Sequence, residues 1–539
     1  GSMGSFKAEM IEPALVTRKQ AKKARRTGED VCRKIVDETF SVGGVNHRQV
    51  TDRNTPSVIN AVFNHRNFWD GRANNMFNGI DPSGRRSNLN NPDQGIWVND
   101  EMGLRKIQVL IKNSSLASQA VGPALSDVEM TCKGSIFPLL AEKMLDRTAL
   151  SQQKVSGTDS VLGDMLHRRG HKSKSHSHDR DHDHDSRSND KKGLMYKYRE
   201  MIELAFQDKY WNQEEPLDDG FYQIESNFSL FWGLAIQMYE ATLVSNMTPY
   251  DDFVRGNNDA LTEQQKLGFE VFIRGDRGNC AGCHSGSEFT SASVIATALA
   301  PDGGPFDLDV ERVVAPEPFQ RMRMMDGGIS VYEGGYYNIG VTPSEMDLCI
   351  GADQGGFPLS YSRQALQKAD GTLVDVADLE ANQAAMGDAA DFAVTSGPVQ
   401  AGERVGVDGA CKTPSLRNVE LTAPYFHNGS QSTLDQVIVS YMLKFKNLHA
   451  EENAENISPA IKYIDIGGLA TDGVSIRGGE IEALKSFMMA LTDERVRLHQ
   501  APFDHPQLTV PNGAKEAKES KKSKKDKDRN KDGMADDLH

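Results

Sequence analysis

The chain has 539 residues, of which 38% are hydrophobic, and a formal net charge of −15 at pH 7. This length exceeds that of a single compact domain and indicates two or three domains with apolar cores. The negative charge argues against a nucleic-acid partner, and no apolar run is long enough to span a membrane.

The first 30 residues are basic and helix-prone, with most of the charge in residues 18–26. We interpret this segment as a solvated surface helix or a frayed terminus rather than a binding arm. Gly1-Ser2-Met3 resembles the remnant of an expression tag, and no signal peptide follows it.

Residues 31–248 are predicted to form a first domain. Pro56 can start a helix, because an apolar face follows it at helical spacing. Trp69 lies beside an Asp-Gly turn, and by composition alone such a residue is more often in the core than at a cofactor. Further helical periodicity falls within residues 114–145, 193–206 and 221–244. The apolar face after Pro56 consists of Val58, Ile59, Val62 and Phe63.

Residues 167–192 interrupt this domain with six histidines among Lys, Arg, Asp and Ser. Such a composition cannot bury apolar surface, so the sequence predicts a disordered insertion. Weak metal binding by the imidazoles is chemically easy, but a solvated spacer is the favoured interpretation.

Residues 249–505 are predicted to form a second domain around Cys280-Ala281-Gly282-Cys283-His284. The C-x-x-C-H pattern is the attachment site of a c-type haem: the thiols bond to the vinyl groups, and the histidine ligates iron. Thr262 is a candidate N-cap for the helix that precedes the motif. A zinc or redox C-x-x-C pair is the competing interpretation, but no second C-x-x-C completes a four-thiolate zinc site.

The rest of this domain is predicted to contain long Gly-, Asp- and Pro-rich loops over residues 300–406, with a small hairpin around 330–337. Helices are expected to begin near Ser432 or Thr433 and to span residues 480–496. Four dispersed cysteines, Cys32, Cys132, Cys349 and Cys411, permit disulfides that the sequence cannot pair.

The tail, residues 506–539, is rich in Lys, Glu and Asp. Asp528, Asn530 and Asp532, followed by Gly533, have the ligand spacing and turn glycine of a calcium loop. His539 stands where the bidentate glutamate is expected, so a solvated charged tail is an equal alternative.

Four segments, in their order and spacing, resemble the bacterial di-haem cytochrome c peroxidase family, which includes the MauG enzymes. The resemblance implies a mainly α-helical protein: two cytochrome-c-like helical domains with long loops, short strands only in those loops, and calcium between the domains. It covers most of residues 43–500. The four segments are 53–73, with Arg-Asn-Thr-Pro and Phe-Trp-Asp-Gly-Arg-Ala; 122–130, from Gly-Pro to Glu-Met; the C-x-x-C-H motif; and 412–429, from Lys-Thr-Pro-Ser-Leu-Arg-Asn to Tyr-Phe-His-Asn-Gly.

The same resemblance assigns roles to individual positions. His284 is the proximal ligand of the C-terminal haem, and Trp69 corresponds to the tryptophan through which electrons pass between haems. Glu129 corresponds to the carboxylate that moves a proton during peroxide cleavage. The implied calcium ligands are Asn54 and the carbonyls of Thr422 and Pro424; oxygen-only ligation suits calcium.

The distal ligand of this haem has two candidates, since family members use Met or Tyr. Tyr441 is in register and Met442 adjoins it; one helical step is about 100°, so both cannot face the iron. We favour Tyr441. A phenolate would lower the haem potential relative to a thioether.

The chain departs from the family in one respect, because members carry two C-x-x-C-H motifs. Only Cys32 lies near the expected first motif, which predicts one covalent haem c and leaves a second, non-covalent haem open. A shortened sequence, a natural one-haem variant, or a first haem supplied by another chain would each explain this.

The sequence therefore predicts a redox enzyme that reduces hydrogen peroxide or oxidises a partner through its C-terminal haem. The alternative is a non-catalytic electron-transfer or structural subunit of a larger haem complex; metal storage by the His-rich insertion is a third, weaker hypothesis. Expected partners are a small cytochrome or cupredoxin donor, or a protein substrate, in a homodimer or larger complex. Haem c attachment predicts a periplasmic or other extracytoplasmic location.

Overall fold

The computed structural model describes residues 4–12, 31–166, 191–294, 319–372, 399–442, 455–458 and 479–507. Most of the basic segment, the His-rich insertion, and the tail with Asp528, Asn530 and Asp532 lie outside these ranges. The chain divides into a larger unit, residues 1–147 with 196–504, and a smaller one, 148–195 with 505–539. The expected domain boundary at residues 248–249 falls inside the larger unit and stays a prediction. No helix of the described residues has the length and apolar character needed to cross a membrane.

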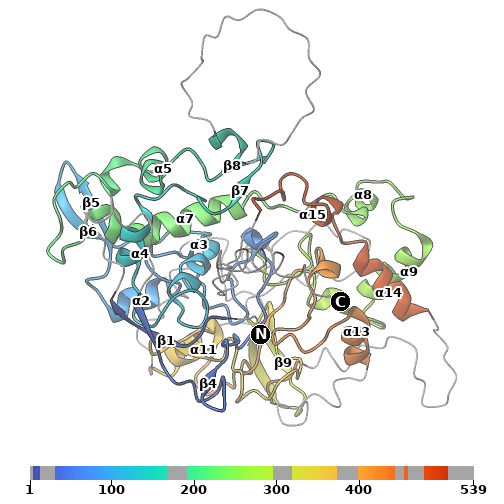
Figure 1. The fold of residues 1–539 in the computed structure, drawn as a ribbon. Helices are drawn as coiled ribbons and strands as arrows, with labels where there is room; N and C mark the ends of the chain where they lie inside the picture. The colour runs from blue at the N-terminus through green and yellow to red at the C-terminus, as the bar shows by residue number, and fades with distance from the viewer. Residues whose placement is uncertain are drawn as a thin grey trace, which may run out of the picture. The chain divides into compact units, whose positions relative to one another are not determined.

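One core of the larger unit forms around α7 (Phe228–Glu240), which packs on α3 (Ser115–Ala120) and α4 (Phe137–Met144) (Figure 1). Gly233 permits the close approach of α3 and α7, because a Cβ there would lie 3.0 Å from the Ala117 carbonyl oxygen and 2.8 Å from the Phe77 ring. Buried Phe77, Phe137 and Phe231 fill the space between the helices. The neighbouring helices are α2 (Arg85–Asn90), α5 (Tyr198–Ala205) and α6 (Gln223–Ser226), with 3₁₀ turns at Pro123–Leu125 and Asp208–Tyr210.

A second core of the same unit forms between α9 (Glu263–Ile273) and α14 (Glu480–Met489). Their backbones meet at Gly268, where a Cβ would lie 1.9 Å from the Ala483 carbonyl oxygen. Thr262 caps α9 as expected: its hydroxyl accepts from the Gln265 amide at 3.2 Å. The other helices here are α8 (Pro249–Val254), α13 (Leu434–Met442) and α15 (Glu494–Arg497), with 3₁₀ turns at Cys280–Gly282 and Val419–Leu421. A further helix, α11 (Tyr361–Ala369), packs on β10 (Ile329–Glu333) and β13 (Phe357–Pro358).

The described strands pair only as two-stranded antiparallel ladders. The hairpin expected around residues 330–337 lies earlier in the chain, over residues 319–333, because β10 pairs with the preceding β9 and β11 pairs with β14. Strands are not confined to the long loops, however, because β5–β6 forms a regular hairpin in the first half of the chain. The pairs are β1 (Ala8–Glu12) with β2 (Val31–Lys34), β3 (Ser41–Val42) with β4 (Val45–Asn46), β5 (Ile96–Asp100) with β6 (Gly103–Ile107), β7 (Lys154–Val155) with β8 (Lys191–Lys192), β9 (Phe319–Arg323) with β10 (Ile329–Glu333), β11 (Tyr336–Tyr337) with β14 (Cys411–Lys412), and β12 (Asp353–Gln354) with β13 (Phe357–Pro358).

The helix expected after Pro56 is a second correction, since only a 3₁₀ turn, Ala61–Phe63, forms there. Asn60 precedes this turn in the left-handed region, at φ 59°. Its side-chain Nδ2 donates to the Ser245 carbonyl at 3.1 Å and to the Glu288 carboxylate at 3.0 Å, and its side-chain Oδ1 accepts from the Ser245 amide at 2.6 Å. These tertiary bonds hold Asn60 in a conformation that ends a helix rather than continuing one.

The four dispersed cysteines form two disulfides, Cys32–Cys132 and Cys349–Cys411. Cys280 and Cys283 are left as free thiols. The structure therefore separates two free cysteines from four that form disulfides. The sequence alone did not determine this pairing.

The smaller unit contains the β7–β8 pair and a 3₁₀ turn at Gly163–Leu166. The Asp159 carboxylate accepts from the amides of Val161 and Leu162 and so starts this turn.

Candidate haem site

A cavity of about 250 Å³ lies in the larger unit, against the C-x-x-C-H segment. Cys280, Cys283 and His284 line it from one segment, and Trp69 and Tyr441 line it from two others. Apolar residues supply much of the wall: Phe272, Ile339, Val341, Leu416, Val419, Leu434, Val437, Ile438, Leu484 and Met488.

A sharp turn after α9 delivers the two thiols to this cavity. Gly278 packs so closely on α9 that a Cβ would lie 2.5 Å from the Val271 carbonyl oxygen. Asn279 then adopts the left-handed conformation, at φ 48°, and the 3₁₀ turn Cys280–Gly282 follows. The turn at Gly278 and Asn279 therefore has a geometric role, because it reverses the chain between the helix and the thiols.

The side chain of His284 is held by its Nδ1 atom. This nitrogen lies 3.1 Å from both the Phe289 and the Pro414 carbonyl oxygens, so it carries the proton and donates. Burial lowers the pKa of His284 to about 4, which keeps the imidazole neutral and leaves Nε2 as the nitrogen able to ligate iron.

The two thiols are also neutral. Burial raises the pKa of Cys280 and of Cys283 to about 12. Two free thiols, a neutral histidine with one ring nitrogen held, and an apolar wall are a donor set that fits haem c.

Tyr441 and Met442 are distinguished by their surroundings. Tyr441, on α13, is among the residues that line the cavity, and burial raises the pKa of its hydroxyl. Met442, which like Tyr441 packs against the aromatic core, is not among the described lining residues. Met488 of α14 also lines the cavity. Its place at the cavity could not be predicted, because a methionine in an amphipathic helix is ordinarily a core residue.

Trp69 is fixed by three contacts at the cavity wall. Its indole N–H donates to the Asn54 carbonyl oxygen at 2.7 Å, and its own carbonyl accepts from the Lys412 amide at 2.7 Å. Its ring meets that of His427 edge to face, with centroids 6.3 Å apart. His427 Nε2 in turn lies 3.7 Å from an Asp347 carboxylate oxygen. His427 belongs to the segment 412–429 that carries the family resemblance, but its contact with Trp69 could not be predicted from the sequence.

The residues implied for calcium lie at an exposed edge of the same cavity. The Asn54 amide donates to the Pro424 carbonyl oxygen at 2.7 Å, and Thr422 lines the same wall. Rotation of that amide by half a turn would direct Asn54 Oδ1 toward the carbonyl, as a shared cation requires. The structure thus brings Asn54 and Pro424 together, and the calcium site stays a prediction.

Glu129 is exposed and is not among the described residues that line this cavity. Its loop is tied to the N-terminal segment: the Ser5 amide donates to the Val128 carbonyl at 2.5 Å, and the Cys32–Cys132 disulfide follows. The role of Glu129 stays a prediction.

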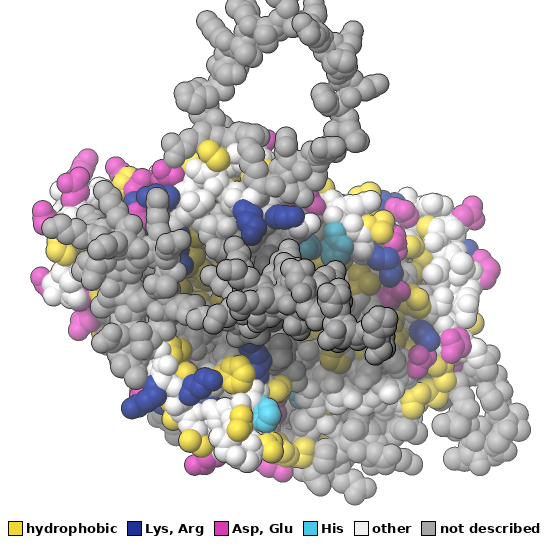
Figure 2. All heavy atoms as spheres, in the orientation of Figure 1, with side chains coloured by type: hydrophobic (Ala, Val, Ile, Leu, Met, Phe, Trp, Pro, Cys, Tyr) yellow, Lys and Arg dark blue, Asp and Glu magenta, His cyan; other side chains and the backbone are white. Residues whose placement is uncertain are grey.

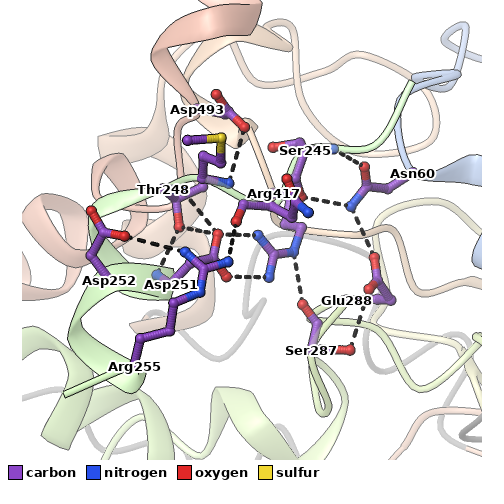
Figure 3. A network of polar contacts seen from close by, with 12 residues as sticks. Asn60, Ser245, Thr248, Asp251, Asp252, Arg255, Ser287, Glu288, Arg417 and Asp493 are labelled. Carbon is purple, nitrogen blue, oxygen red and sulfur yellow. Dashed lines mark hydrogen bonds and ion pairs between the residues drawn. The ribbon is translucent and has the colours of Figure 1, made fainter. Parts of the chain in front are cut away.

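A buried ion pair between Arg417 and Asp251 stabilises the segment that carries Pro414. Figure 3 shows Arg417 directed at Asp251, with nitrogen–oxygen distances of 2.8 and 2.9 Å. Arg417 Nε also donates to the Ser287 carbonyl at 2.7 Å, just after the C-x-x-C-H motif. The pair therefore links α8 to two segments of the cavity wall.

Comparison with known proteins agrees with the motif geometry. A family model described as di-haem cytochrome c peroxidase matches residues 29–156. The chain is 27% identical over 256 residues to cytochrome-c peroxidase IdrP2 of Denitromonas iodatirespirans, covering 48% of this chain and 47% of that protein. It is 42% identical over 212 residues to cytochrome c peroxidase Ccp of Escherichia coli (strain K12), covering 39% and 27%.

A shorter match is to methylamine utilization protein MauG of Methylophilus methylotrophus, 42% identical over 59 residues, covering 11% of this chain and 18% of that protein. The chain thus matches less than half the length of each of these relatives. By these matches, the chain is similar to the di-haem cytochrome c peroxidases and MauG proteins.

Proposed function

We propose that this chain binds one covalent haem c through Cys280, Cys283 and His284 and acts as a cytochrome c peroxidase-type redox protein. It would reduce hydrogen peroxide or oxidise a partner by electron transfer. One observation carries the proposal: two free thiols line the same cavity as a histidine whose Nδ1 is held by the carbonyls of Phe289 and Pro414 at 3.1 Å each.

Haem c in this cavity would supply one-electron redox chemistry. His284 would be its proximal ligand, and the two carbonyls would fix the ring and increase the basicity of Nε2. Tyr441 would be the distal ligand, because it lines the cavity while Met442 does not. The apolar wall would exclude water, which strengthens every charge interaction at the cofactor.

Trp69 is the residue proposed to relay electrons. It lies at the cavity wall, and its N–H donates to the backbone of Asn54, whose side chain is a proposed calcium ligand. Calcium bound by Asn54, Thr422 and Pro424 would hold this wall rigid around the indole. The electron donor would be a small cytochrome or a cupredoxin, in an extracytoplasmic compartment.

A second candidate function is that of a non-catalytic electron carrier or haem-complex subunit. The Cys32–Cys132 disulfide favours it, because Cys32 is the one cysteine near the expected first haem motif and its sulfur is already bonded. Peroxide chemistry would need a second haem beside Glu129, held without thioether bonds or supplied by another chain.

The test is haem stoichiometry by pyridine haemochrome on protein exported with the haem c maturation machinery, followed by a spectrum after peroxide addition. We expect one covalent haem per chain. A high-valent spectrum that Glu129→Gln suppresses would support the peroxidase; one haem with an unchanged spectrum would support the electron carrier. Absence of covalent haem would overturn both.

A further inference from the structure

The described side chains that line the haem cavity include two cations and no carboxylate. Among its described lining residues are one lysine, Lys412, and one arginine, Arg417, but no aspartate or glutamate. Both cations belong to one stretch of chain, residues 411–417, all of which line the cavity.

The two cations differ in how their charge is balanced. Arg417 is paired through two nitrogens with Asp251, as Figure 3 shows, so its charge is compensated within the protein. Lys412 is only 5% exposed, yet no carboxylate of the described residues pairs with its ammonium group. Burial alone acts on it and lowers its pKa to about 8.

A buried ammonium group without a counter-ion is unfavourable, and native proteins pair such charges or neutralise them. Lys412 lies two residues before Pro414, whose carbonyl accepts from the proximal His284. It also lies next to Trp69 along a backbone hydrogen bond of 2.7 Å. Lys412 therefore lines the cavity beside the segment that holds His284 and beside Trp69.

We propose that the ammonium group of Lys412 pairs with a propionate carboxylate of the haem in this cavity. The inference rests on the proposed haem c site and adds to it a cofactor-binding residue that the motif does not include. Charge complementarity selects the ligand: among its described residues the cavity offers one cation without a carboxylate partner, and haem carries carboxylates.

The pairing has a measurable electrostatic consequence. Reduction of the haem adds negative charge, which an adjacent ammonium group stabilises. Removing the ammonium group leaves the propionate uncompensated and lowers the reduction potential. Lys412→Gln removes the charge, Lys412→Arg keeps it, and Lys412→Met keeps the apolar stem without it.

The experiment is a spectroelectrochemical titration of the full chain after haem c maturation. We expect K412Q and K412M to lower the midpoint potential by at least about 59 mV, a tenfold change in the one-electron equilibrium constant, and K412R to restore most of it. Lys266→Gln is the matched control, because it removes the same charge from a surface pair with Glu263 on α9.

The outcomes separate this inference from the proposed function. Normal haem content with an unchanged potential in K412Q and K412M would overturn the propionate pairing alone. A changed axial-ligand spectrum at constant potential would also overturn it, since Lys412 would then bind iron. Wild-type protein without covalent haem would overturn both proposals. Should K412Q not fold, K412M and K412R carry the same comparison.

Discussion

At the scale of single residues, the two thiols and the histidine of the C-x-x-C-H segment are all held in their neutral forms. Burial keeps the thiols of Cys280 and Cys283 protonated and the imidazole of His284 unprotonated. A neutral imidazole with its Nδ1–H bonded to carbonyls is the form that ligates iron. The site is therefore preorganised by the chain itself, through backbone groups that any sequence supplies once the loops are placed.

Tyr441 and Met442 make contrasting predictions about the distal ligand. We expect Tyr441→Phe to change the ferric absorption and electron paramagnetic resonance spectra and to raise the reduction potential, because a phenolate stabilises ferric iron. Met442→Leu is the matched control and is expected to leave both unchanged, since Met442 is not among the described residues that line the cavity. The reverse pattern would assign the ligand to Met442.

Asp251 provides a test of the buried ion pair. Asp251→Asn leaves the Arg417 guanidinium buried and unpaired, so we expect a loss of about 3 kcal/mol in the free energy of unfolding at neutral pH. Chemical denaturation measures it. The adjacent Asp252→Asn is the control: its pair with Arg255 has side chains that are 57% exposed each, and its loss should be below about 0.5 kcal/mol.

The same pair predicts a pH dependence. Burial raises the pKa of Asp251, but the hydrogen bonds from Arg417 and Thr248 outweigh it and leave the pKa below its ordinary value of 3.8. The pair's contribution to stability is therefore present above pH 3.8 and is lost as the pH falls toward the lower folded-state pKa. Wild type should lose its advantage over D251N on acidification; a constant difference would contradict the assignment.

At the scale of secondary-structure elements, the contact between α9 and α14 positions the C-x-x-C-H turn. We expect Gly268→Ala to destabilise the protein by about 1–3 kcal/mol, because the new methyl group meets the Ala483 carbonyl. This outweighs the helix-propensity gain of about 1 kcal/mol. Gly157→Ala, at a position with open space, is the control. Equal stability of G268A and wild type would mean that the two helices do not pack this closely.

Local signals in the sequence predicted elements where the chain itself supplies the partners. The capping pair of Thr262 and Gln265 correctly predicted the start of α9, since both groups lie within one turn. The prediction of a helix after Pro56 was wrong, because the hydrogen bonds that hold Asn60 come from Ser245 and Glu288. These residues lie 185 and 228 positions further along the chain. Long-range hydrogen bonds of this kind leave no periodic trace in a sequence.

At the scale of the whole molecule, the motif predicted which cysteines and which histidine meet, because all three lie within five consecutive residues. The residues around them come from distant segments and were only partly predictable. The resemblance predicted roles for Trp69 and Asn54. It predicted none for Lys412, although this residue belongs to one of the matching segments. Its significance depends on burial and on the absence of a described carboxylate partner, which only the three-dimensional arrangement reveals.

The most direct measurement is the mass of the proteolytic peptide that contains Cys280 and Cys283, after maturation with the haem c attachment machinery. We predict one haem on this peptide, with Cys32 and Cys132 recovered as a disulfide-linked pair that carries none. Unmodified thiols at Cys280 and Cys283, or a haem on Cys32 or Cys132, would contradict the assignment of this cavity as a haem c site.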